Sequence, residues 1–76
     1  MKKVLVLEDE TNIRSFVVIN LKRAGYETIE AGTGEEALDR LARAEYDLLI
    51  LGIDLPGIDG FHVIQTVRQR GSRVPM

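Results

Sequence analysis

The chain of 76 residues contains no cysteine and no tryptophan, and only 5% of its residues are aromatic. Without cysteine, neither a disulfide nor a thiolate zinc site can stabilise the fold, and nothing in the composition points to an oxidising compartment. A chain this short buries only about 60% of the surface that it exposes when unfolded. We therefore expect one domain with a small core, for which contact with a partner chain would be favourable.

Long hydrophobic runs and a strong excess of one charge are also absent. The apolar segments are far shorter than the roughly 20 residues of a membrane-spanning helix, and MKKVLVLEDE becomes acidic before a signal-peptide core could form. The net charge of -2 and the pI of about 5.3 give no general field for nucleic acid. The composition thus predicts a cytoplasmic protein that binds neither membrane nor nucleic acid directly.

Short β-like segments alternate with longer helical segments along the chain. Strands are expected at 3–7, 26–31 and 47–51, and helices at 11–24, 34–44 and 60–70. The first and third strands are almost continuously apolar, as strands covered on both faces are, whereas the second alternates as an edge strand does. Thr33 and Glu36 form a capping-box pattern at the start of the second helix.

This alternation predicts an α/β domain with a parallel sheet and right-handed crossovers. Placing the apolar strands centrally gives the strand order 2-1-3, with the reversal of winding between the first and third strands. Ligands in such sheets bind at that reversal, outside the carboxyl ends of the strands. The segments 8–10 and 52–54 should therefore meet there.

Glu8, Asp9 and Glu10 follow the first strand directly, and three adjacent carboxylates repel one another. A magnesium ion would relieve this repulsion, since Mg²⁺ takes oxygen ligands from one or two carboxylates and keeps several waters. The residues alone leave a second interpretation open. In it the acids face solvent and complement the positive end of the first helix, with Asp9 or Thr11 as its N-cap.

The segments VLVLEDE, GYETIEAGTGEEAL and YDLLILGIDLPGIDGFHVI resemble the first three strand-helix units of CheY-like receiver domains. These are the domains of bacterial two-component response regulators, here of the kind that precede DNA-binding output domains. The resemblance covers essentially the whole chain. It implies a flavodoxin-like, doubly wound parallel sheet of five strands in the order 2-1-3-4-5, truncated here to about three βα units.

In that family a histidine kinase donates a phosphoryl group to an aspartate at the end of the third strand, assisted by Mg²⁺. Carried over by position, the resemblance implies Glu8 and Asp9 as the acidic pair, and Asp54 as the residue whose backbone carbonyl ligates the metal. Gly52 then stands at the phosphoacceptor position. Because glycine has no carboxylate oxygen to attack phosphorus, we expect no phosphorylation there and a weak or absent Mg²⁺ site.

We therefore expect residues 1–76 to form a partial receiver domain that acts through protein-protein interaction and not as an enzyme. The implied partners are a sensor histidine kinase and a C-terminal output domain in transcription regulation. The final VPM looks like the beginning of a fourth strand. The edge of the strand at 47–51 would then be exposed, so that self-association, most simply as a homodimer, is expected.

Two alternatives differ from this interpretation. One is a self-assembling structural half-domain with no signalling role. The other is a dinucleotide-binding fragment, since Gly32-Thr33-Gly34 begins a G-x-G-x-x-A pattern between a strand and a helix. The position of this pattern after the edge-like second strand, and not after the central first strand, argues against nucleotide binding.

Overall fold

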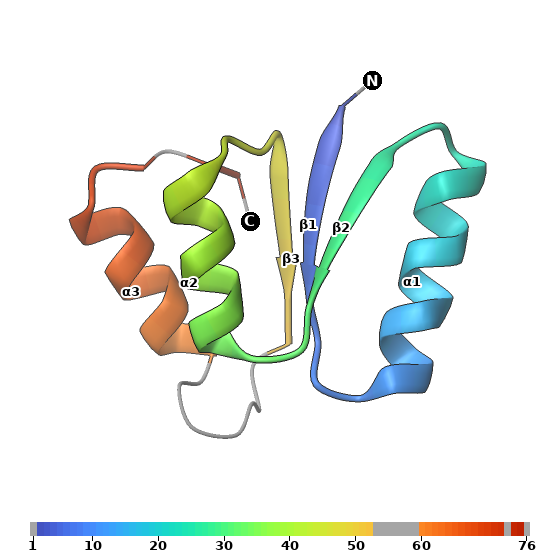
Figure 1. Cartoon of the computed structure of the whole chain (residues 1–76), viewed down its shortest axis with the longest axis horizontal. Coiled ribbons are helices and arrows are strands. Elements are labelled where there is room, and N and C mark those ends of the chain that lie inside the picture. Colours follow the sequence, from blue (N-terminus) through green and yellow to red (C-terminus); the bar gives the residue numbers. More distant parts are fainter. Residues whose placement is uncertain (1, 53–59, 73, 76) are drawn as a thin grey trace.

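The computed structural model describes residues 2–52, 60–72 and 74–75. Its elements are β1 (Lys3–Leu7), α1 (Thr11–Arg23), β2 (Glu27–Ala31), α2 (Gly34–Arg43), β3 (Leu48–Leu51) and α3 (Gly60–Gln69). The strands form one parallel sheet in the order β2-β1-β3 (Figure 1). The α/β class and the predicted strand order are thus confirmed. Within the described ranges, no helix has the length and apolar character needed to cross a membrane.

The elements differ from the sequence prediction at their ends, where local hydrogen bonds determine the first and last residues. β2 and β3 begin one residue later than expected, and the three helices end one residue earlier. Gly25 follows α1 with φ of 94°, a left-handed conformation that glycine adopts readily at the end of a helix. Thr33 caps α2 as predicted, accepting a hydrogen bond from the Glu36 N–H at 3.1 Å.

The N-cap of α1 is Glu10, and the prediction of Asp9 or Thr11 for that role is wrong. The Glu10 carboxylate accepts a hydrogen bond from the Ile13 N–H at 2.7 Å. A glutamate can do this because its longer side chain reaches back over the first turn, where the unpaired N–H groups and the helix dipole favour a negative charge. One of the three clustered acids is therefore used to begin the helix.

Helices α2 and α3 cover one face of the sheet (Figure 1). Leu5, Leu7 and Leu49 point to this face and are fully buried at 0% exposure. They pack with the inward side chains of both helices, among them Ala37 and Val63. This face holds the larger of the two apolar clusters, and we call it the α2–α3 face.

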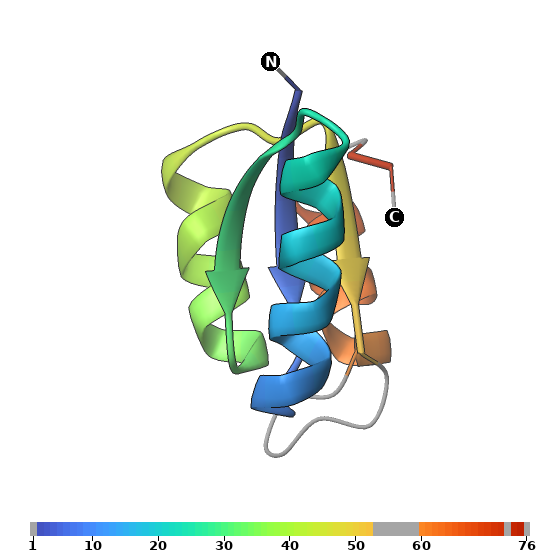
Figure 2. The same cartoon turned by 90° about the vertical axis from the view of Figure 1, so that its right-hand side faces the viewer.

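Among the described elements, helix α1 alone covers the opposite face, which we call the α1 face. Val4 and Val6 of β1 are buried there with Val18 of α1, whereas Leu48 and Ile50 of β3 are only partly buried. Seen from this side, α1 lies in front of β1 and leaves β3 beside it (Figure 2). The distribution of one helix on one face and two on the other is the one expected from right-handed crossovers.

The outer edge of β3 is not bare along its whole length. The Leu49 N–H donates a hydrogen bond to the Pro75 carbonyl at 2.7 Å. A bond of this kind is the first step in pairing a further parallel strand with β3. The predicted exposure of this edge is therefore incomplete, because Pro75 supplies one acceptor to it.

Candidate functional site

The carboxyl ends of the strands converge around Glu8. The Gly52 N–H donates a hydrogen bond to the Leu7 carbonyl at 2.7 Å, and the Glu8 N–H donates to the Ala31 carbonyl at 3.1 Å. Residue 52 thus lies directly beside the beginning of the acidic segment, as predicted from the strand order. This meeting point lies at the end of the sheet where the arrowheads of the strands point (Figure 1).

Within the described residues, the carboxylates at this point are those of Glu8, Asp9 and Glu10. Glu8 is half-buried and Asp9 is exposed, while Glu10 is engaged as the N-cap of α1. Asp54 lies outside the described residues. Within the described part of the chain, no group of three or more His, Cys, Asp or Glu residues is arranged to hold a metal ion. The donor set here is therefore the pair Glu8 and Asp9, next to a glycine.

Arg14 of α1 holds this end of the sheet together, and sequence reasoning missed it. Its Nη1 donates to the Glu8 carbonyl at 2.7 Å, and its Nε donates to Glu30 Oε1 at 3.1 Å. The side chain is 20% exposed, so water screens these bonds less than those of a surface arginine. A signal was present in the sequence, because Arg14 shares the inward side of α1 with Val18 and Leu21 at spacings of four and seven residues.

The glycine-rich segment after β2 has structural roles in the same network. A Cβ atom on Gly32 would approach Arg14 Nη1 to 3.2 Å, so the absence of a side chain there leaves room for the guanidinium. Thr33 caps α2, as described above. Arg40 of α2 donates from Nε to the Glu30 carbonyl at 3.2 Å. These contacts give the glycine-rich segment a structural role that requires no bound dinucleotide.

An apolar groove runs from the acidic end of the sheet along the α1 face, and we call it the α1–β3 groove. Its volume is about 170 Å³. Glu8 lines it together with apolar residues and one glycine: Val6, Leu7, Ile13, Val17, Ile50, Leu51 and Gly52. Gly52 thus contributes to two features, the group of residues around Glu8 and the end of this groove.

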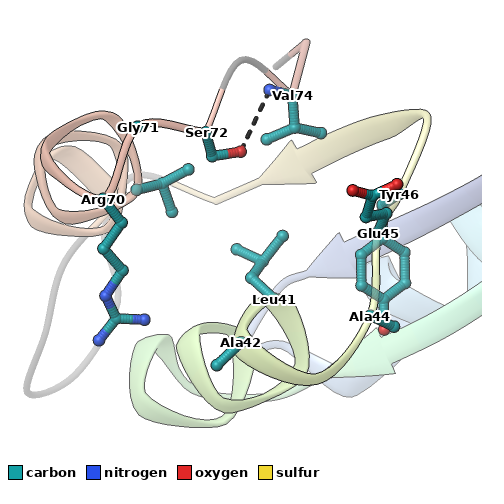
Figure 3. A pocket seen from close by; sticks show the side chains of 10 residues that line it. Leu41, Ala42, Ala44, Glu45, Tyr46, Arg70, Gly71, Ser72 and Val74 are labelled. Carbon is teal, nitrogen blue, oxygen red and sulfur yellow. Dashed lines mark hydrogen bonds between the residues drawn. The ribbon is translucent and has the colours of Figure 1, made fainter.

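A larger hollow lies between the last turns of α2 and α3 (Figure 3). Its volume is about 700 Å³, and Leu41, Tyr46 and Val74 are among its lining residues. Arg70 lies at its side, and the Ser72 hydroxyl accepts a hydrogen bond from the Val74 N–H at 3.3 Å. Because the segment that leads into β3 lines it, this hollow lies towards the amino ends of the strands, away from Gly52 and Glu8.

Comparison with known proteins agrees with this geometry. The model of the response regulator receiver domain family matches residues 4–76 of the chain. The chain belongs to the response regulator receiver family. Receiver domains of this family are signalling modules, and the resemblance inferred from the sequence motifs is confirmed.

Among curated relatives, the receiver chain is 40% identical to the alkaline phosphatase synthesis transcriptional regulatory protein PhoP of Bacillus subtilis over 75 residues. It is 38% identical to the transcriptional regulatory protein ResD of the same organism over 68 residues. These alignments include 99% and 90% of this chain, but only 31% and 28% of the respective relatives. The receiver chain therefore spans less than a third of either regulator.

Solved structures of receivers share the fold. The response regulator TrrA of Thermotoga maritima, determined with Mg²⁺ and BeF, superposes with a TM-score of 0.89 and 44% identity. The alignment covers 92% of the receiver chain and 61% of TrrA. The receiver domain of the Francisella response regulator 1452 superposes with a TM-score of 0.96 and 28% identity, over 99% of this chain and 62% of that one. TrrA has also been solved in complex with the histidine kinase ThkA.

Proposed function

We propose that this receiver chain is an interaction module of two-component signalling that accepts no phosphoryl group at the usual position. The observation that supports this most directly is the bond from the Gly52 N–H to the Leu7 carbonyl. It sets residue 52 beside Glu8, where the family resemblance calls for the aspartate nucleophile. Glycine offers only backbone atoms, and an acyl phosphate cannot form on them.

The same reasoning extends to the metal. Mg²⁺ would be held by the Glu8 and Asp9 carboxylates together with the backbone carbonyl of Asp54, and it would neutralise the charge of a phosphoryl group. Without a carboxylate at Gly52, one ligand and one negative charge are missing. We infer that Mg²⁺ binds weakly here or not at all, and that the chain itself carries out no chemistry.

The proposed partners follow from the family. A sensor histidine kinase would recognise the acids and the first helix, both of which this chain retains, and a C-terminal output domain would act in transcription regulation. TrrA, 44% identical to this chain, was crystallised with a histidine kinase. A second candidate is a self-associating structural module without a signalling role, favoured by the exposed Ile13 and Phe16 on α1. Binding of a phosphorylated histidine kinase domain to the 76-residue chain would favour the first candidate.

The phosphoacceptor proposal is tested by treating the chain and its Gly52→Asp variant with a small phosphodonor and Mg²⁺, followed by intact-mass measurement. We expect no added phosphoryl mass on the parent chain. Isothermal titration should show Mg²⁺ binding at least about tenfold tighter in Gly52→Asp, because a further carboxylate close to the ion adds a large Coulomb attraction.

Gly52→Asn serves as the matched control, since it adds nearly the same volume without the charge. We expect its Mg²⁺ affinity to stay close to that of the parent. Phosphoryl labelling of the parent chain would contradict the proposal and reveal another acceptor. Equal Mg²⁺ affinity of the parent and Gly52→Asp would contradict the inferred loss of the metal ligand.

A further inference from the structure

The backbone of Glu8 is held by a hydrogen bond on each side. Its N–H donates to the Ala31 carbonyl at 3.1 Å, and its own carbonyl accepts from Arg14 Nη1 at 2.7 Å. That carbonyl belongs to the peptide that joins Glu8 to Asp9. Because a peptide unit is planar, a bond to its oxygen restricts the orientation of the whole unit. Arg14 therefore constrains both acidic residues through the backbone that they share.

The guanidinium of Arg14 is itself fixed by a second element. Its Nε donates to Glu30 Oε1 at 3.1 Å, and Glu30 directly precedes the Ala31 whose carbonyl binds Glu8. The bonds thus form a closed ring through the start of α1 and the carboxyl ends of β1 and β2. A Cβ atom on Gly32 would come within 3.2 Å of Arg14 Nη1, the nitrogen that binds the Glu8 carbonyl. The position of this nitrogen therefore depends on the loop after β2 as well.

We propose that Arg14 is a positioning residue, which keeps Glu8 and Asp9 arranged for a divalent cation although position 52 has no carboxylate. This inference rests on the proposed function, in which Gly52 alone accounts for the weak Mg²⁺ site, and it names the residue that maintains the rest of that site. Restoring one carboxylate in Gly52→Asp is then enough to restore Mg²⁺ binding, and that binding depends on Arg14.

The effect of charge and the effect of position have opposite signs at Arg14. Replacing it with methionine removes a positive charge beside the acids and leaves the Glu30 carboxylate without its partner. Both changes make this end of the sheet more negative, and Coulomb attraction alone would then raise the affinity for Mg²⁺. Loss of a residue that orients metal ligands instead lowers metal affinity, typically by about 10–100-fold. A decrease in affinity therefore reports lost positioning.

The test is isothermal titration of Mg²⁺ into Gly52→Asp with and without Arg14→Met, with circular dichroism to verify folding. We expect about tenfold weaker binding when Arg14 is replaced. Arg14→Lys should also weaken binding, because an ammonium keeps the charge and lacks the planar fork that makes both bonds. Arg43→Met is the matched control: its pair with Asp39 is exposed on α2, so the Mg²⁺ affinity should not change.

Gly32→Ala in the same Gly52→Asp chain perturbs the geometry and leaves every charge in place. The added methyl group would displace the Arg14 guanidinium by a few tenths of an ångström. We expect a decrease in Mg²⁺ affinity that is smaller than that of Arg14→Met and has the same sign. An unchanged affinity in Gly32→Ala together with a tighter one in Arg14→Met would show that Arg14 acts through charge, and would overturn the inference.

Unchanged Mg²⁺ affinity in folded Arg14→Met would overturn the inference as well, as would an equal loss in Arg43→Met. If Arg14→Met does not fold, Arg14→Lys decides, since a binding constant equal to that of Gly52→Asp would contradict a positioning role. A folded Gly52→Asp chain without Mg²⁺ binding would show that the acidic pair is not arranged for a cation. Phosphoryl labelling is measured on the parent chain, so the failure of this inference and the failure of the phosphoacceptor proposal can be distinguished.

Discussion

The two faces of the sheet are made of the same kinds of side chain and are covered very differently. On the α2–α3 face, Leu5 and Leu49 are fully buried under two helices. On the α1 face, Val6 is buried equally well, but Ile50 is only partly buried and Phe16 projects into solvent. Apolar residues thus occur on both faces. Among the described residues, however, the α2–α3 face has buried side chains from all three strands, whereas the α1 face has buried strand residues from β1 alone.

The difference follows from the dimensions of helices and strands. A helix with its side chains is about 10 Å wide, whereas neighbouring strands lie about 4.8 Å apart. One helix can therefore cover roughly two strands of a three-stranded sheet. Helix α1 packs on β1 and β2, and β3 stays partly uncovered on that face. A strand's apolar pattern thus indicates which face of the sheet a side chain takes, but it does not determine how completely that side chain is buried.

The strongest test of this comparison uses two neighbouring residues of β3 that point to opposite faces. Leu49→Ala should cost about 2–5 kcal/mol, because the residue is completely enclosed. Ile50→Ala should cost about half as much, because part of that side chain is already in contact with water. Urea denaturation at low protein concentration, followed by circular dichroism, measures both losses. Equal losses would show that the two faces are packed equally well.

Arg14 attaches α1 to the sheet through hydrogen bonds on the α1 face, where apolar packing is incomplete. Arg14→Met keeps most of the aliphatic stem but removes the bonds to the Glu8 carbonyl and to Glu30. We expect a loss of about 1–2 kcal/mol, with faster amide hydrogen exchange at residues 8–14 than in α2. Arg43→Met is the control, because its exposed pair with Asp39 should contribute less than about 0.5 kcal/mol. Equal effects of the two substitutions would contradict a special role for Arg14.

The smallest expected effect is a gain in stability. The hydroxyl of Thr28 in β2 is buried and has no hydrogen-bond partner among the described residues. Thr28→Val keeps the shape and removes the unpaired polar group, so it should stabilise the chain by about 1 kcal/mol. The midpoint of thermal unfolding should then rise by about 4–8 °C. Thr33→Val should lower the midpoint of thermal unfolding, because that hydroxyl caps α2. A decrease for both variants would contradict the assignment of the Thr28 hydroxyl as unpaired.

Much of the fold and part of the candidate site could be predicted from the sequence. Continuous and alternating apolar runs gave the observed bounds of β1 and placed β2 to within one residue, and the strand order brought residue 52 next to Glu8. The N-cap of α1 was not predicted, because Asp, Glu and Thr all occur near that position and only the bond to the Ile13 N–H selects Glu10. Asp54 lies outside the described residues, so its predicted part in the metal site stays a prediction.

The bridging role of Arg14 could not be read along the chain. Its partners are six residues away at Glu8 and sixteen residues away at Glu30, and they become neighbours only after β2 pairs with β1. The helical spacing of Arg14 showed that it would point inward, without indicating which oxygen atoms it would meet. Its guanidinium also needs the space at Gly32, which belongs to a different loop.

The positions of strands and helices to within a residue, the face that each residue takes and the absence of a side chain at Gly52 are properties of local order. They depend on the twofold period of strands, the 3.6-residue period of helices and the identity of single residues, so the amino acids in order were enough to establish them. The α1–β3 groove, the exposure of Phe16 and the contacts of Arg14 were decided by tertiary packing. They depend on how far one helix reaches across three strands, and this distance exists only once the chain has folded.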